Sequence, residues 1–304
     1  MSRPPQASLG YFMYTLFLFT KSDSITFMLP EALFGICGAL SGPLITTNPK
    51  SHPADVLFRV PKVFLWVWLN LLIFTLANQR LPGSIIEDRI NKPFRPLPAG
   101  RITASQTTRL LLFAIVLVLG VTYFWLGSFE ETLLLLACTW MYNDLEGGED
   151  FVGRNILLAF IYTLYGSGSL RVAVQSASGQ KSMSLRGYLW SGVVGGIILT
   201  TMQVQDLKDQ KGDKLRKRRT APLVLGDRFT RWTIAIPVAL WSVFCPIFWT
   251  LGRYLAIPPV SLGFVVAARV VSLDGVSNDR RTWKLWCYWL ILLYFLPAAK
   301  NHFS

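Results

Sequence analysis

The chain has 304 residues, of which 52% are hydrophobic and 15% charged, and its mean hydropathy is +0.41. A soluble domain is typically about 25% charged, so this composition excludes an ordinary soluble enzyme, a coiled coil and a disordered chain. Four cysteines without a C-x-x-C pair favour neither a disulfide scaffold nor a zinc site, and two histidines are too few for histidine-based chemistry. The net charge of +13 would suggest a nucleic-acid partner in a soluble protein, but in a membrane protein it sets topology, and we expect no nucleic-acid binding.

The chain opens with an apolar run, Leu9 to Thr20, that is too short to cross a bilayer. Only Arg3 precedes it and no signal-cleavage pattern follows, so we interpret residues 1–24 as an interfacial or re-entrant segment. Nine later stretches have the apolar character of membrane-spanning helices, the fourth of them being short. They are 25–45, 60–78, 107–126, 129–143, 155–174, 186–205, 232–251, 254–272 and 283–299. The sequence therefore predicts an all-α integral membrane protein, a single nine-helix transmembrane domain over residues 1–304.

Lysine and arginine concentrate in two connecting segments, 78–108 and 206–231. Basic loops stay on the cytoplasmic side of a membrane. We therefore expect the N-terminus and both loops to face the cytosol, in a membrane such as that of the endoplasmic reticulum.

The two basic loops share a Pro-Leu-x-x-Gly pattern, at Pro96–Gly100 and again at Pro222–Gly226. Each pattern is followed by a threonine, Thr103 or Thr230, that could open the next helix. The repetition predicts two pseudo-symmetric halves whose polar loops face each other.

The second loop carries three acids, Asp206, Asp209 and Asp213. If the preceding helix continued outward, their spacing would place all three carboxylates on one face. Magnesium prefers carboxylate and phosphate oxygens, and the basic run Lys214–Arg219 that follows could bind an oxyanion. The alternative is a solvated loop whose acids merely balance its bases.

The first loop offers the same chemistry. It contains the amide of Asn78, the carboxylates Glu87 and Asp88, and the cations Lys92 and Arg95. Two such clusters on one membrane face could hold one diphosphate through magnesium ions, with a hydrocarbon tail in the apolar bundle below.

At this point the sequence resembles a known family. The segment Asn78-Gln79…Glu87-Asp88-x-x-Asn91-Lys92-Pro93-x-Arg95-Pro96-x-Pro98-x-Gly100 resembles the first aspartate-rich motif of the UbiA superfamily of intramembrane prenyltransferases. The segment Asp206-x-x-Asp209-x-x-x-Asp213 resembles the second. Gln79, Pro82 and Ile86 stand where the common first motif has aspartates, a departure similar to a fungal branch that also has an element like Tyr142–Leu145.

The resemblance implies a fold, a cofactor and roles for individual residues. It implies nine helices with both motifs on cytosolic loops, a prenyl diphosphate substrate and Mg²⁺. The implied magnesium ligands are Asn78, Glu87, Asp88, Asp206, Asp209 and Asp213. The implied diphosphate-binding residues are Asn78, Lys92, Arg95, Lys214, Arg218 and Arg219. Asp88 and the three acids of the second loop would ionise the substrate, and Tyr162 and Tyr165 would stabilise the carbocation.

Members of that branch include terpene cyclases and prenyltransferases. The altered first motif, and the lack of a histidine within a span to act as acceptor base, favour cyclisation, with farnesyl ahead of geranylgeranyl diphosphate as substrate. The alternative within the family is transfer of the prenyl group to an aromatic or quinone acceptor. A transporter is the alternative from another class, but its polar groups would be expected near the bilayer midplane. The sequence carries no prediction of the oligomeric state.

Overall fold

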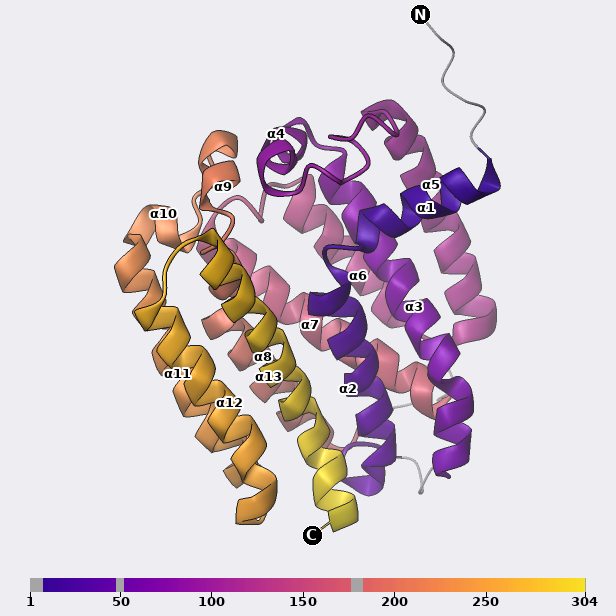
Figure 1. The fold of residues 1–304 in the computed structure, drawn as a ribbon. Coiled ribbons are helices and arrows are strands. Elements are labelled where there is room, and N and C mark those ends of the chain that lie inside the picture. Colours follow the sequence, from indigo (N-terminus) through magenta and orange to yellow (C-terminus); the bar gives the residue numbers. More distant parts are fainter. Residues whose placement is uncertain (1–7, 48–51, 176–182, 304) are drawn as a thin grey trace, which may run out of the picture.

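The computed structural model describes residues 8–47, 52–175 and 183–303, which form helices joined by turns, with two isolated β-bridges (Figure 1). Residues 1–7 of the predicted interfacial segment lie outside the described residues. The first half comprises α1 (Leu9–Thr20), η1 (Ser24–Met28), α2 (Leu29–Leu40), η2 (Gly42–Leu44), α3 (Pro53–Gln79), α4 (Pro82–Asn91), α5 (Ala104–Val121), η3 (Thr122–Leu126) and α6 (Phe129–Asn143). The second half comprises α7 (Phe151–Val174), α8 (Leu185–Thr201), η4 (Met202–Gln205), α9 (Gln210–Arg216), α10 (Ala221–Leu225), α11 (Asp227–Phe248), α12 (Arg253–Ser272) and α13 (Val276–Phe303).

All nine predicted stretches are helical, but fewer of them are both long and apolar enough to cross a membrane. Within the described residues six helical segments have the length and apolar composition of a membrane span: α3, α5 with η3, α7, α8 with η4, α11 and α12. A seventh is obtained if α1 and the segment Ser24–Leu40, which are bent by 66° relative to each other, count as one broken span. The short α6 and the more polar α13 do not pass. An all-helical membrane bundle is therefore confirmed, and the count of nine spans is not.

Local sequence signals explain where several helices begin. Thr103 caps α5 in a reciprocal pair with Gln106, as its position after the first Pro-Leu-x-x-Gly pattern predicted. Thr230 instead lies inside α11, which begins at Asp227. The two pattern glycines behave alike, because Gly100 and Gly226 both have positive φ, 69° and 86°, which residues with a Cβ rarely adopt.

Helix α7 is the centre of the bundle and packs against α2, α3, α6 and α8. Small residues make this possible. A Cβ on Gly35 of α2 would come within 2.4 Å of the Ser169 backbone, and one on Gly168 would come within 2.1 Å of the Trp66 ring. Trp66 is fully buried and donates a hydrogen bond from Nε1 to Thr132 at 3.2 Å. The helices therefore approach through glycine contacts of the kind that membrane bundles use.

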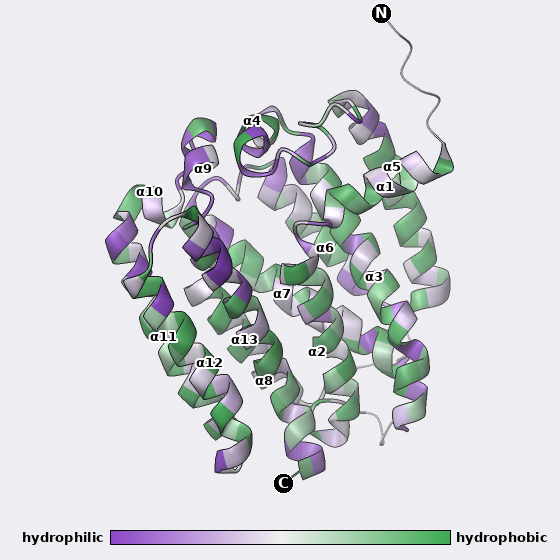
Figure 2. Ribbon diagram, in the orientation of Figure 1, coloured by the Kyte–Doolittle hydropathy of each residue, from purple (hydrophilic) through white to green (hydrophobic). Residues whose placement is uncertain are grey.

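The polar residues collect at one end of the bundle. Figure 1 shows the short helices α4, α9 and α10 grouped at this end, with the C-terminus at the other. Figure 2 shows hydrophilic residues concentrated there, over helices whose middle portions are mainly hydrophobic. Helix α1 lies across the same end and exposes Leu9, Met13 and Phe17, while Arg101 stacks on Tyr11 with its guanidinium carbon 3.9 Å from the ring centroid. That α1 lies in the membrane interface remains a prediction.

Candidate active site

The two basic loops, residues 78–108 and 206–231, also carry the predicted acidic residues and are called the acidic loops from here on. They meet through α4 and α9. Asn91 Nδ2 donates to the Asp209 carbonyl at 3.0 Å, and Arg216 Nη1 donates to Ser84 at 2.7 Å. A Cβ on Gly212 would lie 2.3 Å from the Asn91 amide, so the close approach of the two helices depends on that glycine. The two loops are therefore in direct contact through α4 and α9, although the contacting residues lie outside the repeated Pro-Leu-x-x-Gly pattern.

The expected continuous helix through the second loop is wrong. Helix α8 ends at Thr201, a short 3₁₀ segment follows to Gln205, and turns lead to α9, before which Asp209 has non-helical backbone angles. Local hydrogen bonds favour the break, since the side chains of Thr201 and Gln203 bond backbone carbonyls of the last helical turn. The three acids therefore converge along a folded backbone and do not share one helical face.

A cavity lies between these loops and the apolar bundle. Its polar wall carries five carboxylates and four cationic side chains, and its apolar wall is formed by Phe27, Phe74 and Leu158. The remaining lining residues are Asp23, Thr75, Asn78, Gln79, Glu87, Lys92, Arg95, Tyr142, Arg154, Gln205, Asp206, Asp209, Asp213 and Arg218. The site is therefore charged on the side of the loops and apolar on the side of the bundle.

The buried acids are paired with arginines. Arg154 Nη1 lies 2.5 Å from both oxygens of Asp206, and each of these side chains is 4% exposed. Arg95 Nη1 lies 3.0 Å from both oxygens of Asp88. Such pairs satisfy charges that would be very unfavourable alone in a low-dielectric interior.

Glu87 is shared between two arginines. Its Oε2 lies 3.0 Å from Arg216 and 3.7 Å from Arg218, and Arg218 also donates to the hydroxyl of Tyr142 at 3.3 Å. Burial raises the pKa of Glu87, but Arg218, Lys92 and Arg216 outweigh it and hold that pKa below the ordinary value. Glu87 is therefore a carboxylate in the midst of cations.

Asp213 has the opposite balance. Burial, followed by the negative charges of Asp206 and Glu87, raises the pKa of Asp213 to about 8. Its Oδ2 is buried and accepts no hydrogen bond. Arg218 Nη1 lies 3.8 Å from the other oxygen, Oδ1, and lowers the pKa only in part. A further positive charge next to Oδ2 would lower the pKa and give that oxygen a partner.

The donor set fits magnesium in kind. Among the described residues no three carboxylate, histidine or cysteine side chains are gathered into a metal-binding group. Magnesium, however, usually takes one or two protein carboxylates and completes its shell with water and substrate phosphates. The unpartnered oxygen of Asp213 and the all-oxygen character of the acidic wall agree with that requirement.

The structure separates the predicted site residues into three groups. Eight of them line the cavity: Asn78, Glu87, Lys92, Arg95, Asp206, Asp209, Asp213 and Arg218. Asp88 does not line it, because its side chain is buried against the cavity residue Arg95. Lys214 and Arg219 do not line it, and the Arg219 side chain is 71% exposed beside Asp150. Tyr162 and Tyr165 lie one layer deeper, with ring centroids 4.6 and 5.8 Å from that of the cavity residue Phe27.

Two charged residues of the cavity lie outside both loops and were missed from the sequence. Asp23 comes from the turn after α1, and Arg154 comes from the first turn of α7. An ionisable residue in or beside an apolar span is by default a functional candidate, and that rule applied to Arg154 would have found it. Tyr142 and Asn143 also reach the site, since Asn143 Oδ1 accepts from Asn78 Nδ2 at 2.9 Å.

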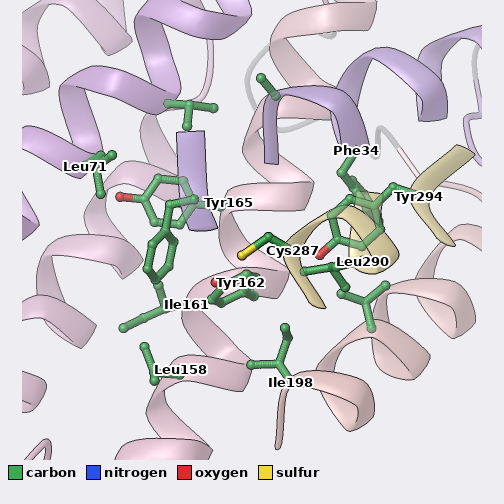
Figure 3. Close-up of a cluster of buried hydrophobic side chains, with 14 of the residues drawn as sticks. Phe34, Leu71, Leu158, Ile161, Tyr162, Tyr165, Ile198, Cys287, Leu290 and Tyr294 are labelled. Atoms are coloured by element: carbon green, nitrogen blue, oxygen red, sulfur yellow. The ribbon is translucent and has the colours of Figure 1, made fainter. Parts of the chain in front are cut away.

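Below the cavity lies a layer of aromatic side chains, which contains the buried acid Glu31. Figure 3 shows Tyr162, Cys287 and Tyr294 near one another within this layer. The Tyr162 hydroxyl donates to the Thr26 carbonyl at 2.9 Å, and that of Tyr294 donates to Glu31 at 3.0 Å. Phe27 thus separates the charged cavity from a core rich in aromatic rings.

Comparison with known proteins agrees with this geometry. Residues 83–291 match the UbiA prenyltransferase family. The chain is 31% identical over 294 residues to the fumagillin β-trans-bergamotene synthase of Aspergillus fumigatus, covering 94% of this chain and 92% of the relative. It is 28% identical over 307 residues to a polyprenyl transferase of Hericium erinaceus, covering 98% and 99%.

The fold has a solved counterpart. A UbiA homologue from Archaeoglobus fulgidus, solved with GPP and Mg²⁺, superposes with a TM-score of 0.62 at 13% identity, covering 93% of this chain and 98% of that one. The family match covers more than half of the chain and the relatives span nearly all of it. This chain therefore belongs to the UbiA prenyltransferase family and is an integral membrane enzyme of that type.

Proposed function

We propose that this enzyme ionises a prenyl diphosphate with the help of Mg²⁺ and cyclises the resulting carbocation, with farnesyl preferred to geranylgeranyl diphosphate, in terpenoid secondary metabolism. The observation that carries the proposal is the two-sided cavity, in which carboxylates and arginines face an apolar wall of Phe27, Phe74 and Leu158. A molecule with a diphosphate head and a hydrocarbon tail matches both sides.

The chain's own groups bind and orient the diphosphate. Lys92, Arg95 and Arg218 face the cavity and donate to its oxygens. Lys214 and Arg219 belong to the second loop, like Arg218, but lie outside the cavity, and they attract the diphosphate before it enters the cavity. The magnesium ligands are Asn78, Glu87, Asp88, Asp206, Asp209 and Asp213. When bound, Mg²⁺ neutralises charge that develops on the leaving diphosphate.

The bond between the allylic carbon and the diphosphate oxygen then breaks, and its electron pair leaves with the diphosphate. The cation that remains lies over Phe27, with Tyr162 and Tyr165 behind it. A desolvated aromatic face stabilises a cation by about 2 kcal/mol or more. The apolar wall also excludes water, which would otherwise capture the cation.

Transfer of the prenyl group to an aromatic or quinone acceptor is the second candidate, and the similarity to a polyprenyl transferase favours it. The ionising groups are the same in both reactions. The two differ in whether turnover requires a second substrate.

The test is incubation of membranes that contain the enzyme with farnesyl or geranylgeranyl diphosphate and Mg²⁺, without an acceptor. Diphosphate release and extracted hydrocarbons are measured together. A cyclic hydrocarbon in equal amount to diphosphate supports the cyclase. Turnover that begins only after phenols or quinones are added would establish the transferase.

The acidic residues are tested in the same assay. Asp88→Ala and Asp209→Ala should abolish diphosphate release while the protein still accumulates in membranes. If both keep more than about a tenth of wild-type turnover, a loss of ~1.4 kcal/mol or less, the two-loop site is refuted. Lys300→Ala, at the opposite end of the bundle, is the control and should release diphosphate as wild type does.

We further propose that the N-terminus and the α4 and α9 loops face the cytosol from the endoplasmic reticulum membrane. The concentration of lysine and arginine in these loops supports this orientation. Labelling of a cysteine introduced at Lys214, which is exposed, by an impermeant thiol reagent in sealed microsomes is the test. If the cysteine is labelled only after the membrane is permeabilised, the loops face the lumen and the proposed orientation is wrong.

A further inference from the structure

The turn between α1 and η1 contributes to the site although it belongs to neither acidic loop. Asp23 lines the cavity, and Ser22 Oγ donates to Asp23 Oδ2 at 2.8 Å. Both residues contact Arg95, which comes from the first acidic loop and is 5% exposed. The N-terminal segment is thereby joined to the diphosphate-binding wall.

The Arg95 guanidinium is divided between two carboxylates. Nη1 donates to both oxygens of Asp88 at 3.0 Å. Nη2 donates to Asp23 at 2.8 Å and to Ser22 at 2.8 Å, and Nε donates to Ser22 at 3.3 Å. One edge of the arginine therefore faces a proposed magnesium ligand, and the other is fixed by the N-terminal turn.

We infer that Ser22 and Asp23 are positioning residues that hold Arg95 by one edge, so that its Nη1 edge is available to the diphosphate once Asp88 binds magnesium. This inference rests on the proposed function. It assigns the N-terminal turn a role in substrate binding that acts only through Arg95.

The physical reason is competition for Asp88. A carboxylate that ligates Mg²⁺ gives up part of its acceptor capacity and negative charge to the metal, so Asp88 would hold Arg95 less strongly, and a buried guanidinium without a partner is strongly unfavourable. An arginine held only by Asp88 would therefore either resist the metal or leave its position. The bonds to Ser22 and Asp23 survive that exchange and keep the donor oriented, which is what preorganised binding of an anion requires.

Binding of an inert substrate analogue tests the inference without turnover. The full chain in nanodiscs is titrated, in Mg²⁺, with farnesyl thiolodiphosphate, in which sulfur replaces the bridging oxygen so that the molecule does not ionise. Asp23→Ala and Arg95→Gln are measured singly and together by calorimetry. We expect Asp23→Ala to weaken binding about tenfold in the wild-type background and to change it less than about twofold in the Arg95→Gln background.

Milder variants separate positioning from misfolding. Asp23→Asn retains a carbonyl acceptor for Nη2 and should recover most of the affinity, and Ser22→Ala should weaken binding about threefold. Ser24→Ala is the matched control, because the Ser24 hydroxyl bonds only the Thr20 carbonyl, and it should bind the analogue as wild type does.

The outcomes that overturn the inference are distinct. If Asp23→Ala binds as wild type does, or weakens binding equally with and without Arg95, the positioning role is wrong, and the second result makes Asp23 an independent ligand. If the wild-type chain itself does not bind the analogue with Mg²⁺, the proposed function fails and the inference fails with it.

Discussion

Replacement of Arg154 by methionine isolates the charge of Asp206. Arg154 Nη1 lies 2.5 Å from both Asp206 oxygens, and the two side chains are 4% exposed. Removing one partner of a buried ion pair costs about 3–5 kcal/mol, because the other charge is left without compensation. Domains are stable by roughly 5–15 kcal/mol, so Arg154→Met should lose a large part of the free energy of unfolding.

A second substitution tests the cause. In Arg154→Met/Asp206→Leu both charges of this pair are gone, and replacing a buried pair by apolar groups of similar volume is often neutral or stabilising by about 1–4 kcal/mol. The double variant should therefore recover its stability. It should still release no diphosphate, since the proposed metal ligand Asp206 is gone.

The assay is equilibrium unfolding of the purified chain in mixed micelles without metal, followed by tryptophan fluorescence, alongside diphosphate release in membranes. Arg253→Met is the control, because Arg253 is exposed at the start of α12, and it should unfold within about 0.5 kcal/mol of wild type. If Arg154→Met unfolds like this control, or the double variant is no more stable than the single, the ion-pair reasoning is refuted.

Three further outcomes are expected. Gly168→Ala would press a methyl group against the buried Trp66 ring and should destabilise the bundle by about 1–3 kcal/mol, whereas Gly120→Ala meets nothing within 4 Å and should not; equal unfolding midpoints would contradict the packing argument. Because the pKa of Asp213 is raised to about 8, its acid form is favoured in the folded chain. Metal-free stability should therefore fall as pH rises from about 4 to about 8, and Asp213→Asn should flatten that slope in unfolding measured at several pH values. Chelation of divalent ions by EDTA should stop diphosphate release and added Mg²⁺ should restore it; undiminished release in EDTA would refute the metal requirement.

Hydropathy predicted where the helices lie, because burial in a bilayer requires long apolar stretches whatever their neighbours. It did not predict how α8 ends. The bend from Thr201 to Asp209 depends on side-chain hydrogen bonds to the backbone and on the contact of Gly212 with Asn91, neither of which changes the pattern of apolar residues. For this reason the prediction that the three acids share one helical face was wrong.

The acids and cations of the two loops were predicted because they are close in sequence and similar in pattern. Asp23 and Arg154 could not be joined to them that way, since each lies at the end of a different apolar segment and reaches the cavity only through helix packing. Arg219 shows the converse. It continues the same basic run as Arg218, but its side chain is directed to Asp150 at the surface.

Phe27 lies between the charged cavity and the aromatic layer, two regions whose sequences can vary separately. Above it lie the charged groups contributed by loops and turns, and below it lies the aromatic layer of Tyr162, Tyr165 and Tyr294, contributed by α7 and α13. Under the proposed function, substitutions in the lower region would reshape the space available to the hydrocarbon tail without removing the ion pairs above. A lineage with this construction can acquire new products while it keeps one way of activating the substrate, and directed evolution of product range should begin in that aromatic layer.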